Sequence, residues 1–338
     1  MGDPQPTHLE ADTSDEFGVF HAFALDGNGG GRPVSWDEAK SWTPDKGVLW
    51  LDLNRDDDHV KQWLHESSGI DETICDALLK PETRPRAHSD SRGVLLILRG
   101  VNLNPGADPD EMVVVRTWGE QSRVIMLRRF RVMAVRDLAD AIRQGRGPTD
   151  AGALLEQLAH RLTERMFPVV MNIDELIDKY EEAMAADEVE DRTARAELME
   201  MRRQAVAIRR YLSPQREALS RLQNEPIEWL DPRDRAHLRE ASDQTMRYVE
   251  DLEEARERAA MLREELMARA SDRMNRTMYT LSVVAALFLP LSFVTGLLGI
   301  NVAGIPGTQT GWAFGLVCVL LVVGLVLEVI LFRKMKWF

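Results

Sequence analysis

Two long apolar stretches separate the C-terminal part of the sequence from the highly charged part before it. Residues 277–300 and 312–332 each reach the roughly 20 residues that a helix needs to cross a bilayer, and residues 277–332 contain one charged side chain, Glu328. A buried helix of a soluble protein rarely stays uncharged on every face over such a length. The pattern therefore predicts two transmembrane helices joined by the short uncharged segment 301–311.

Basic residues flank both predicted spans at their inner ends. Three of them precede the first span and three follow the second, in the tail 333–338: Arg269, Arg273, Arg276, Arg333, Lys334 and Lys336. Because positive residues favour the cytoplasmic side of a membrane, we expect both termini to be cytoplasmic and segment 301–311 to be external.

Residues 17–150 alternate short apolar runs with helical patterns, as an α/β domain does. Five runs have the length of strands, at 17–25, 48–53, 94–101, 112–118 and 123–127. Three segments have helical periodicity, at 57–67, 71–79 and 132–144. The glycine-rich segment 26–33 is followed neither by Lys-Ser/Thr nor by a helical pattern, so it predicts a turn rather than a phosphate-binding loop.

Strand signals end near residue 150, and helical patterns continue from there to the membrane. Residues 152–185 and 189–222 predict an antiparallel helical hairpin within segment 151–230. Asp231 and Pro232 then supply a cap and a proline at the first helical position. No further glycine or proline occurs before Pro290, so one helix of about 100 Å is predicted over 233–298. Segment 231–300 would be a stalk that continues into the first span. The predicted fold class is an α+β membrane protein: an N-terminal α/β cytoplasmic domain, a long helical stalk and two C-terminal transmembrane helices.

The predicted stalk carries an apolar seam whose steps alternate between three and four residues, the period of a coiled coil. Its members are Leu238, Ala241, Thr245, Tyr248, Leu252, Ala255, Ala259, Leu262 and Leu266. The seam fits packing on the preceding hairpin and equally fits packing on the stalks of neighbouring copies.

The same period continues into the first span and defines what we call the pore face. Its members are Met274, Met278, Leu281, Ala285, Leu289, Ser292 and Gly296, ahead of Asn301. The pore face has no Asp, Glu or His, and therefore no anionic oxygen that could replace the water of a divalent ion. Periodicity alone fits a pore lining that closes by dewetting and also fits a packing face in lipid. Because two spans cannot enclose a pore, a pore would require a homo-oligomer.

Charge and composition narrow the classes of function. The net charge is −13, and residues 277–338 hold Glu328 against three basic residues, so residues 1–276 carry −15. This acidity argues against nucleic acid as a partner and fits either attraction of cations or ordinary solubility. Residues 1–16 contain five acids and predict a disordered tail. Cys75 and Cys318 share no motif and the seven histidines form no metal-ligand pair, so neither a structural zinc site nor an enzyme is predicted.

The residues at the outer end of the first span carry a family resemblance. Gly299-Ile300-Asn301 resembles the Gly-Met-Asn signature of the CorA family of divalent-cation transporters, and FLPLSFVTGLLGIN at 288–301 resembles that family's first span. With isoleucine in the signature, VAGIPG at 302–307 and IRRYLSPQREALSRL at 208–222, the chain is most similar to the zinc-transporting branch, ZntB. The resemblance covers most of the chain and is most specific over 272–336.

The resemblance implies a homopentamer in the bacterial cytoplasmic (inner) membrane, with zinc or another divalent cation as substrate and no permanently bound cofactor. It implies that five first spans line the pore through the pore face, and that Asn301 contacts the hydrated cation at the outer mouth. A ring of amides accepts hydrogen bonds from polarised water without binding the ion as deeply as carboxylates would. The zinc-transporting branch further implies uptake coupled to protons.

The chain departs from many relatives because segment 302–311 has no acidic residue to concentrate cations. Relatives also bind regulatory cations between cytoplasmic domains, and Glu264 and Asp272 are candidates for such a site. Two alternatives remain open: a passive magnesium, cobalt or nickel channel of the same family, and a membrane-anchored scaffold or sensor whose function would not depend on Asn301.

Overall fold

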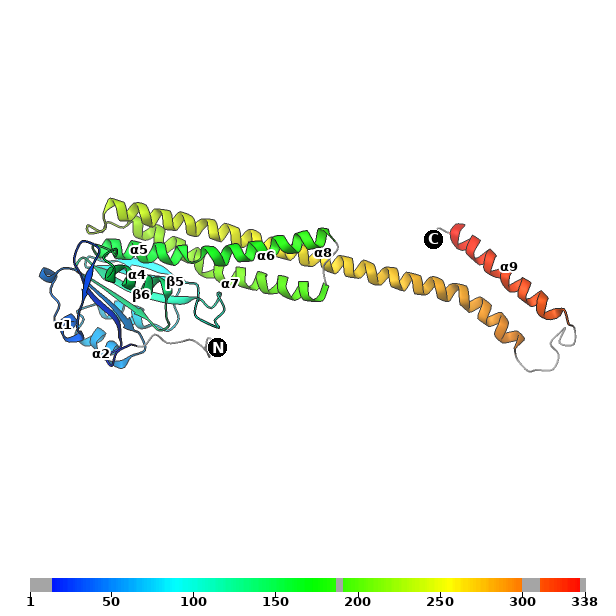
Figure 1. Cartoon of the computed structure of the whole chain (residues 1–338), viewed down its shortest axis with the longest axis horizontal. Coiled ribbons are helices and arrows are strands. Elements are labelled where there is room, and N and C mark those ends of the chain that lie inside the picture. The colour runs from blue at the N-terminus through cyan, green and yellow to red at the C-terminus, as the bar shows by residue number, and fades with distance from the viewer. Residues whose placement is uncertain (1–13, 187–190, 300–310, 335–338) are drawn as a thin grey trace. The chain divides into compact units, whose positions relative to one another are not determined.

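The structure is a computed structural model that describes residues 14–186, 191–299 and 311–334 (Figure 1). The chain divides into two compact units, Met1–Arg263 and Glu264–Phe338. Of the predicted acidic tail 1–16, only the last three residues are described. Asp15 accepts hydrogen bonds from the backbone N–H groups of Phe17 at 2.9 Å and Val19 at 2.8 Å, so residues 15 and 16 belong to the folded domain rather than to the tail.

A mixed sheet forms the centre of the first unit. Within the described residues it has seven strands in the order β2-β1-β3-β7-β6-β5-β4, and every neighbouring pair except β3–β7 is antiparallel. The strands are β1 (Val19–Leu25), β2 (Gly31–Pro33), β3 (Leu49–Asn54), β4 (Arg86–Ser89), β5 (Val94–Gly100), β6 (Val113–Glu120) and β7 (Arg123–Arg128). All five predicted strands are present. β2 and β4 were not predicted, because three or four residues are too few for alternation to show.

The parallel pair β3–β7 joins the two halves of the sheet and contains a buried ion pair. Asp52 and Arg128 are 0% and 1% exposed, and the Arg128 Nη2 atom donates to Asp52 Oδ2 at 2.9 Å. The Arg128 guanidinium also donates to the Phe130 carbonyl at 3.1 Å and lies 4.0 Å from the centre of the Phe20 ring. Because each buried ion loses several kcal/mol of solvation, such a pair persists only with near-complete pairing.

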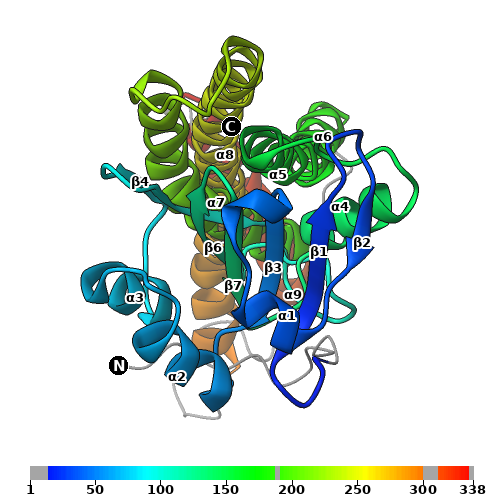
Figure 2. The same cartoon turned by 90° about the vertical axis from the view of Figure 1, so that its left-hand side faces the viewer.

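Helices cover both faces of the sheet (Figure 2). Three helices lie over one core, which includes Leu51 and Trp63. Two others, together with parts of two long helices that follow in the sequence, lie over the opposite core, which includes Val115 and Leu138. The first group is α1 (Trp36–Lys40), α2 (Asp58–Glu66) and α3 (Glu72–Leu79), and the second is α4 (Met133–Arg143) and α5 (Ala151–Glu164); a short 3-10 helix, η1, spans Pro44–Lys46. α2, α3 and α4 were predicted, whereas α1, with five residues, was not.

The predicted helix 152–185 is two helices, α5 and α6 (Phe167–Ala185). Pro168 lies in the first turn of α6 and has no N–H to donate to the Glu164 carbonyl, as a continuous helix would require. The expectation of a single helix was therefore wrong at this point. The second helix of the predicted hairpin is α7 (Asp191–Asn224).

α8 (Pro232–Leu298) is one continuous helix of 67 residues that begins in the first unit and ends in the second. Its seam residues from Leu238 to Leu262 are all buried within a single chain. Leu238 belongs to the same core as Leu155 of α5 and Leu219 of α7. The seam therefore packs on the preceding helices of its own chain, which decides between the two alternatives that the sequence left open.

An ion-pair cluster also ties α8 to α6. Arg258 donates to Asp174 at 2.7 Å, to Glu181 at 2.8 Å and to Asp178. Hydrogen bonds to Glu181 and Asp178 raise the pKa of Arg258, and the bond from Arg258 lowers the pKa of Glu181. One guanidinium group thereby pairs with three carboxylates, which are not free to bind a cation.

A buried carboxyl, Asp234, lies in the first turn of α8 against Gly152 of α5. A side chain at Gly152 would collide with the Asp234 Oδ2 atom, so this contact requires glycine. Burial, followed by repulsion from Asp231 and Asp150, raises the pKa of Asp234 to about 6. The start of α8 therefore holds a group that titrates near neutral pH.

The second unit consists of the remainder of α8 and of α9 (Ala313–Lys334). Both contain a segment long and apolar enough to cross a membrane, and almost none of either segment is buried within the chain. Leu281 is 69% exposed and Phe314 is 80% exposed. Because large contiguous apolar surfaces are unfavourable in water, a lipid bilayer is the surrounding that suits these helices. The predicted segments 301–311 and 333–338 lie outside the described residues, except for Gly311, Arg333 and Lys334.

Candidate functional site

The pore face predicted from the sequence lies on the apolar half of α8. Because residues 274–296 are helical throughout, steps of three and four residues place all seven of its members on one side of the helix. Met274, Leu281, Leu289 and the other members are exposed in the single chain, but Val284 and Phe293, outside the face, are exposed as well. Exposure alone therefore does not distinguish the pore face from the rest of the span.

The outer end of the pore face is made of small residues. No atom lies within 4 Å of the position that a Cβ atom at Gly296 would take, so no contact within the chain requires glycine there and a second helix has room to approach. The Gly299 N–H donates to the Thr295 carbonyl at 2.9 Å and completes the last turn after Leu298. Ile300 and Asn301, the other two residues of the predicted selectivity motif, lie outside the described residues.

The chemistry of the pore face suits an ion that keeps its water. Its members offer thioether, hydrocarbon and hydroxyl groups, and the described residues contain no group of three or more His, Cys, Asp or Glu side chains placed to hold a metal. Divalent cations give up most of their water only for several carboxylate or carbonyl oxygens, imidazole nitrogens or thiolates, and a single hydroxyl does not replace these. Passage along this face would therefore depend on hydration rather than on direct ligation.

The predicted regulatory residues Glu264 and Asp272 are exposed and form no salt bridge with any residue that the structure describes. Arg269 pairs instead with Glu265 at 2.5 Å. At about 100° per residue, Asp272 lies roughly 200° around α8 from Met274, and Glu264 roughly 80°. The helix thus does not bring these two carboxylates together on the pore face.

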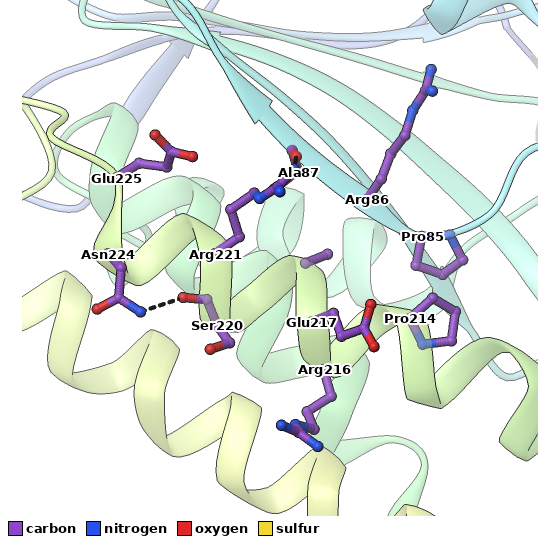
Figure 3. A pocket seen from close by; sticks show the side chains of 11 residues that line it. Pro85, Arg86, Ala87, Pro214, Arg216, Glu217, Ser220, Arg221, Asn224 and Glu225 are labelled. Carbon is purple, nitrogen blue, oxygen red and sulfur yellow. Dashed lines mark hydrogen bonds between the residues drawn. The ribbon is translucent and has the colours of Figure 1, made fainter.

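A hollow of about 550 Å³ between β4 and α7 is lined by three arginines (Figure 3). Figure 3 shows Arg86, Arg216 and Arg221 pointing in different directions. Arg221 Nη1 donates to the Ala87 carbonyl at 3.4 Å, and Glu225 in the same lining accepts from Ser89 Oγ at 2.6 Å. Because the guanidinium groups do not converge and carboxylates lie among them, this hollow is not a built anion site.

Comparison with known proteins finds one family over most of the chain. Residues 45–334 match the family described as CorA-like Mg²⁺ transporter protein. The divalent cation transporter CmaX of Pseudomonas aeruginosa is 39% identical over 329 residues, which cover 96% of this chain and 98% of that protein. The zinc transport protein ZntB of Pectobacterium carotovorum subsp. carotovorum is 34% identical over 307 residues, which cover 90% and 92%. The solved structure of the full-length CmaX protein matches with a TM-score of 0.84 at 39% identity, over 96% of this chain and 100% of that one. These similarities confirm the predicted fold class and the resemblance carried by the first span.

Proposed function

The chain belongs to the CorA-like Mg²⁺ transporter family, and from this premise we propose that it takes up zinc through a homopentameric pore lined by the pore face of α8. Transport of divalent cations is the activity of the family. The observation that carries the proposal is the pore face: an uncharged side of a continuous helix, exposed in the single chain, that runs through the apolar half of α8.

Several copies are needed because the described residues of one chain contain only two helices long and apolar enough to cross a membrane. Backbone and polar groups inside a bilayer must find partners within protein or water, and a closed ring of equivalent helices is the simplest arrangement that encloses a water-filled path. The open space at Gly296 allows neighbouring α8 helices to approach closely at the outer end.

The proposed path uses polar groups outside and apolar groups inside. Asn301 would receive the hydrated ion at the external mouth, as the sequence resemblance implies, and Ser292 would present a hydroxyl about two turns further in. Leu281, Ala285 and Leu289 would form a constriction that excludes water, and therefore ions, when the helices move together. Because the path offers no anionic ligand, an ion could leave it as easily as it entered.

Zinc is supported by the similarity to ZntB, whose name states zinc transport, and coupling to protons is proposed only because the sequence resemblance implies it. The more similar relative CmaX is named only for divalent cations, so a passive magnesium, cobalt or nickel channel is the competing function. The basic ends at Arg276 and Arg333 support a location in the bacterial inner membrane with both termini in the cytoplasm.

Uptake of radioactive zinc into proteoliposomes tests the proposal. Asn301→Ala should remove most of the uptake while native mass spectrometry still finds a pentamer, because the amide ring is lost and assembly is not affected. Asn275→Ala, the same change on α8 outside the pore face, is the matched control and should retain uptake. Parental uptake by the Asn301 variant would contradict the pore mouth, and magnesium uptake without competition from zinc would favour the passive channel.

We propose a regulatory role for Glu264 and Asp272 separately from the pore. It is supported by their exposure and by the lack of ion-pair partners among the residues that the structure describes, which leave both carboxylates available to a cation held between copies. Changing both residues, to Gln and Asn respectively, should weaken inhibition by internal zinc. An unchanged inhibition curve would exclude the pair as a regulatory site.

A further inference from the structure

Glu328 on α9 is the one charged side chain within the two spans, and it belongs neither to the pore face nor to the proposed regulatory pair. Its Oε2 atom is buried and has no hydrogen-bond partner among the residues that the structure describes. A carboxylate inside a bilayer is costly unless it pairs with another group, reaches water or takes up a proton. Glu328 therefore requires a hydrogen-bond or ion-pair partner, water or a proton that α9 itself does not supply.

Glu328 lies on the less exposed side of α9. The half-buried residues of this helix, apart from Val329, follow steps of three and four: Ala313, Val317, Leu321, Gly324, Glu328 and Phe332. Gly324 is one turn before Glu328, and a Cβ atom there would meet nothing within 4 Å. Because small residues allow helices to approach closely in membranes, the carboxyl lies on a face suited to helix packing rather than to lipid.

The groups at the same depth on α8 are neutral. Glu328 precedes Arg333 by five residues, about 7.5 Å along the helix, and the same number of residues beyond Arg276 on α8 leads to Leu281 and Ser282. Thr280 donates its hydroxyl to the Arg276 carbonyl at 2.9 Å, whereas the Ser282 hydroxyl makes no hydrogen bond within the described residues. Ser282 can donate to or accept from a carboxyl, but it cannot neutralise a carboxylate.

The charged side chains closest to Glu328 along the lengths of the two spans lie outside the apolar layer. They are Arg333 and Lys334 on α9 and Arg273 and Arg276 on α8; the other titratable side chains of the spans are Tyr279 and Cys318. Three apolar residues, 329–331, separate Glu328 from Phe332 and the basic end of α9. Neutralisation by a proton needs no such side chain to enter the apolar layer.

We infer that Glu328 is an intramembrane proton site, which takes a proton from water on the external side and releases it to cytoplasmic water as a cation passes through the pore. The O–H bond on the carboxyl is the only bond that forms or breaks, and the proton comes from water and returns to it. The neutral acid can donate to Ser282 or to another helix at little cost, whereas the carboxylate cannot stay unpaired in lipid. This inference rests on the proposed transport function and names Glu328 as the residue responsible for its proposed proton coupling.

Zinc uptake into proteoliposomes under an imposed pH gradient is the first test. Glu328→Gln copies the neutral acid but holds no exchangeable proton, so it should transport zinc with no dependence on the gradient, and Glu328→Asp should restore that dependence. Val326→Gln, which places the same amide on the exposed side of α9, should leave the parental response unchanged. The inference is overturned if Glu328→Gln keeps the parental response, or if the parent transports zinc with no response to the gradient.

Infrared spectroscopy of the reconstituted full-length protein gives a second readout that needs no transport. The spectrum of the parent should contain the C=O stretch of a protonated carboxylic acid that the spectrum of Glu328→Gln lacks. Identical spectra would overturn the proton site, including the case in which Arg276 reaches in and keeps Glu328 ionised. A parent that shows the band but takes up no zinc would contradict the proposed function and leave the proton site standing.

Discussion

The two halves of α8 use the same spacing of apolar residues for different purposes. In the first half, Leu252 of the seam is completely buried by helices of its own chain; in the second half, Leu281 of the pore face is 69% exposed. Each residue belongs to a face whose members are three or four residues apart, and both faces lie on one unbroken helix. The spacing therefore shows that a face packs against something, but not whether the partner is the same chain, another copy or lipid.

The difference extends to charged groups. The first unit encloses Asp52 and Arg128 as a paired couple, whereas in the second unit Glu328 Oε2 has no hydrogen-bond partner among the residues that the structure describes. The apolar core of the first unit is buried within the chain, whereas the apolar segments of α8 and α9 in the second unit are almost entirely exposed within it. Substitutions that act on one unit and spare the other would sharpen this contrast.

The largest effect on stability is expected from Asp52→Asn. It leaves the Arg128 guanidinium buried without its counter-charge, and breaking a buried ion pair costs about 3–5 kcal/mol. Urea unfolding of the detergent-solubilised protein, followed by circular dichroism, measures the loss. Glu328→Gln is the control in the second unit and should shift the same transition little. Equal shifts would remove the distinction between the two units.

A matched pair of leucines on α8 should give the next largest effect. Leu252→Ala opens a cavity in a packed core and should cost about 2–5 kcal/mol. Leu281→Ala removes the same atoms from a side chain that the chain itself does not bury, so the first unit should unfold at nearly the parental urea concentration. If Leu281→Ala destabilised the first unit as much, the two halves of α8 would not differ as described.

Asp234→Asn should stabilise the first unit, by an amount that grows as the pH rises from about 4 to about 6 and then stays constant. Since the folded state raises the pKa of Asp234 from 3.8 to about 6, it binds this proton more tightly than the unfolded chain does. Stability should therefore rise as the pH falls through 6 toward 4, by on the order of 2 kcal/mol. The asparagine variant should lack that rise and be more stable than the parent at pH 7.5.

The same variant tests whether Asp234, rather than the proposed site at Glu328, gives zinc uptake its pH dependence. Asp234→Asn should leave the pH dependence of zinc uptake as it is in the parent, because Asp234 lies in the first unit. A loss of that dependence would assign the coupling to the start of α8 rather than to Glu328.

The smallest effect is expected from Arg258→Met. Its three partners on α6 are 42% to 55% exposed at their side chains, so water screens much of the attraction, and we expect a loss of about 1 kcal/mol that shrinks in high salt. Lys40→Met, which breaks a single exposed pair with Asp37, is the control and should change stability by less than about 0.5 kcal/mol. A loss from Arg258→Met that did not depend on salt would point to packing of its side chain instead.

The sequence predicted the fold wherever a pattern extended over enough residues. α8 was predicted nearly to its ends because no glycine or proline interrupts it before Pro290, and α2 and α3 because each shows helical periodicity. In the structure, Asp57 and Asp71 cap these two helices. β4, with four residues, has no period to detect, and the break before Pro168 depended on a single missing hydrogen bond. The parallel pairing of β3 with β7 left no local signal at all.

The candidate site was predicted less completely. Periodicity gave the pore face but not its partner, and only a family resemblance gave Asn301 a role. Glu328 stands out in the sequence as the one charge in the spans. The proton site proposed there depends on an Oε2 atom that has no partner among the described residues, which no sequence pattern reveals. Whether a polar atom has a hydrogen-bond partner can be seen only once the side chains are placed in space.

The parallel pair β3–β7 has a consequence for how the protein folds. It brings together residues 74 positions apart, such as Leu49 and Arg123, whereas β4 to β7 pair with their neighbours in sequence. Contacts between distant residues form slowly, so we expect the two half-sheets to form first and to join last. Pulsed hydrogen exchange should protect the amides of β5 and β6 before those that link β3 to β7, and simultaneous protection would contradict this order. Until the halves join, β3 and β7 each present an unpaired strand edge, so this step is when a newly made chain is most exposed to aggregation.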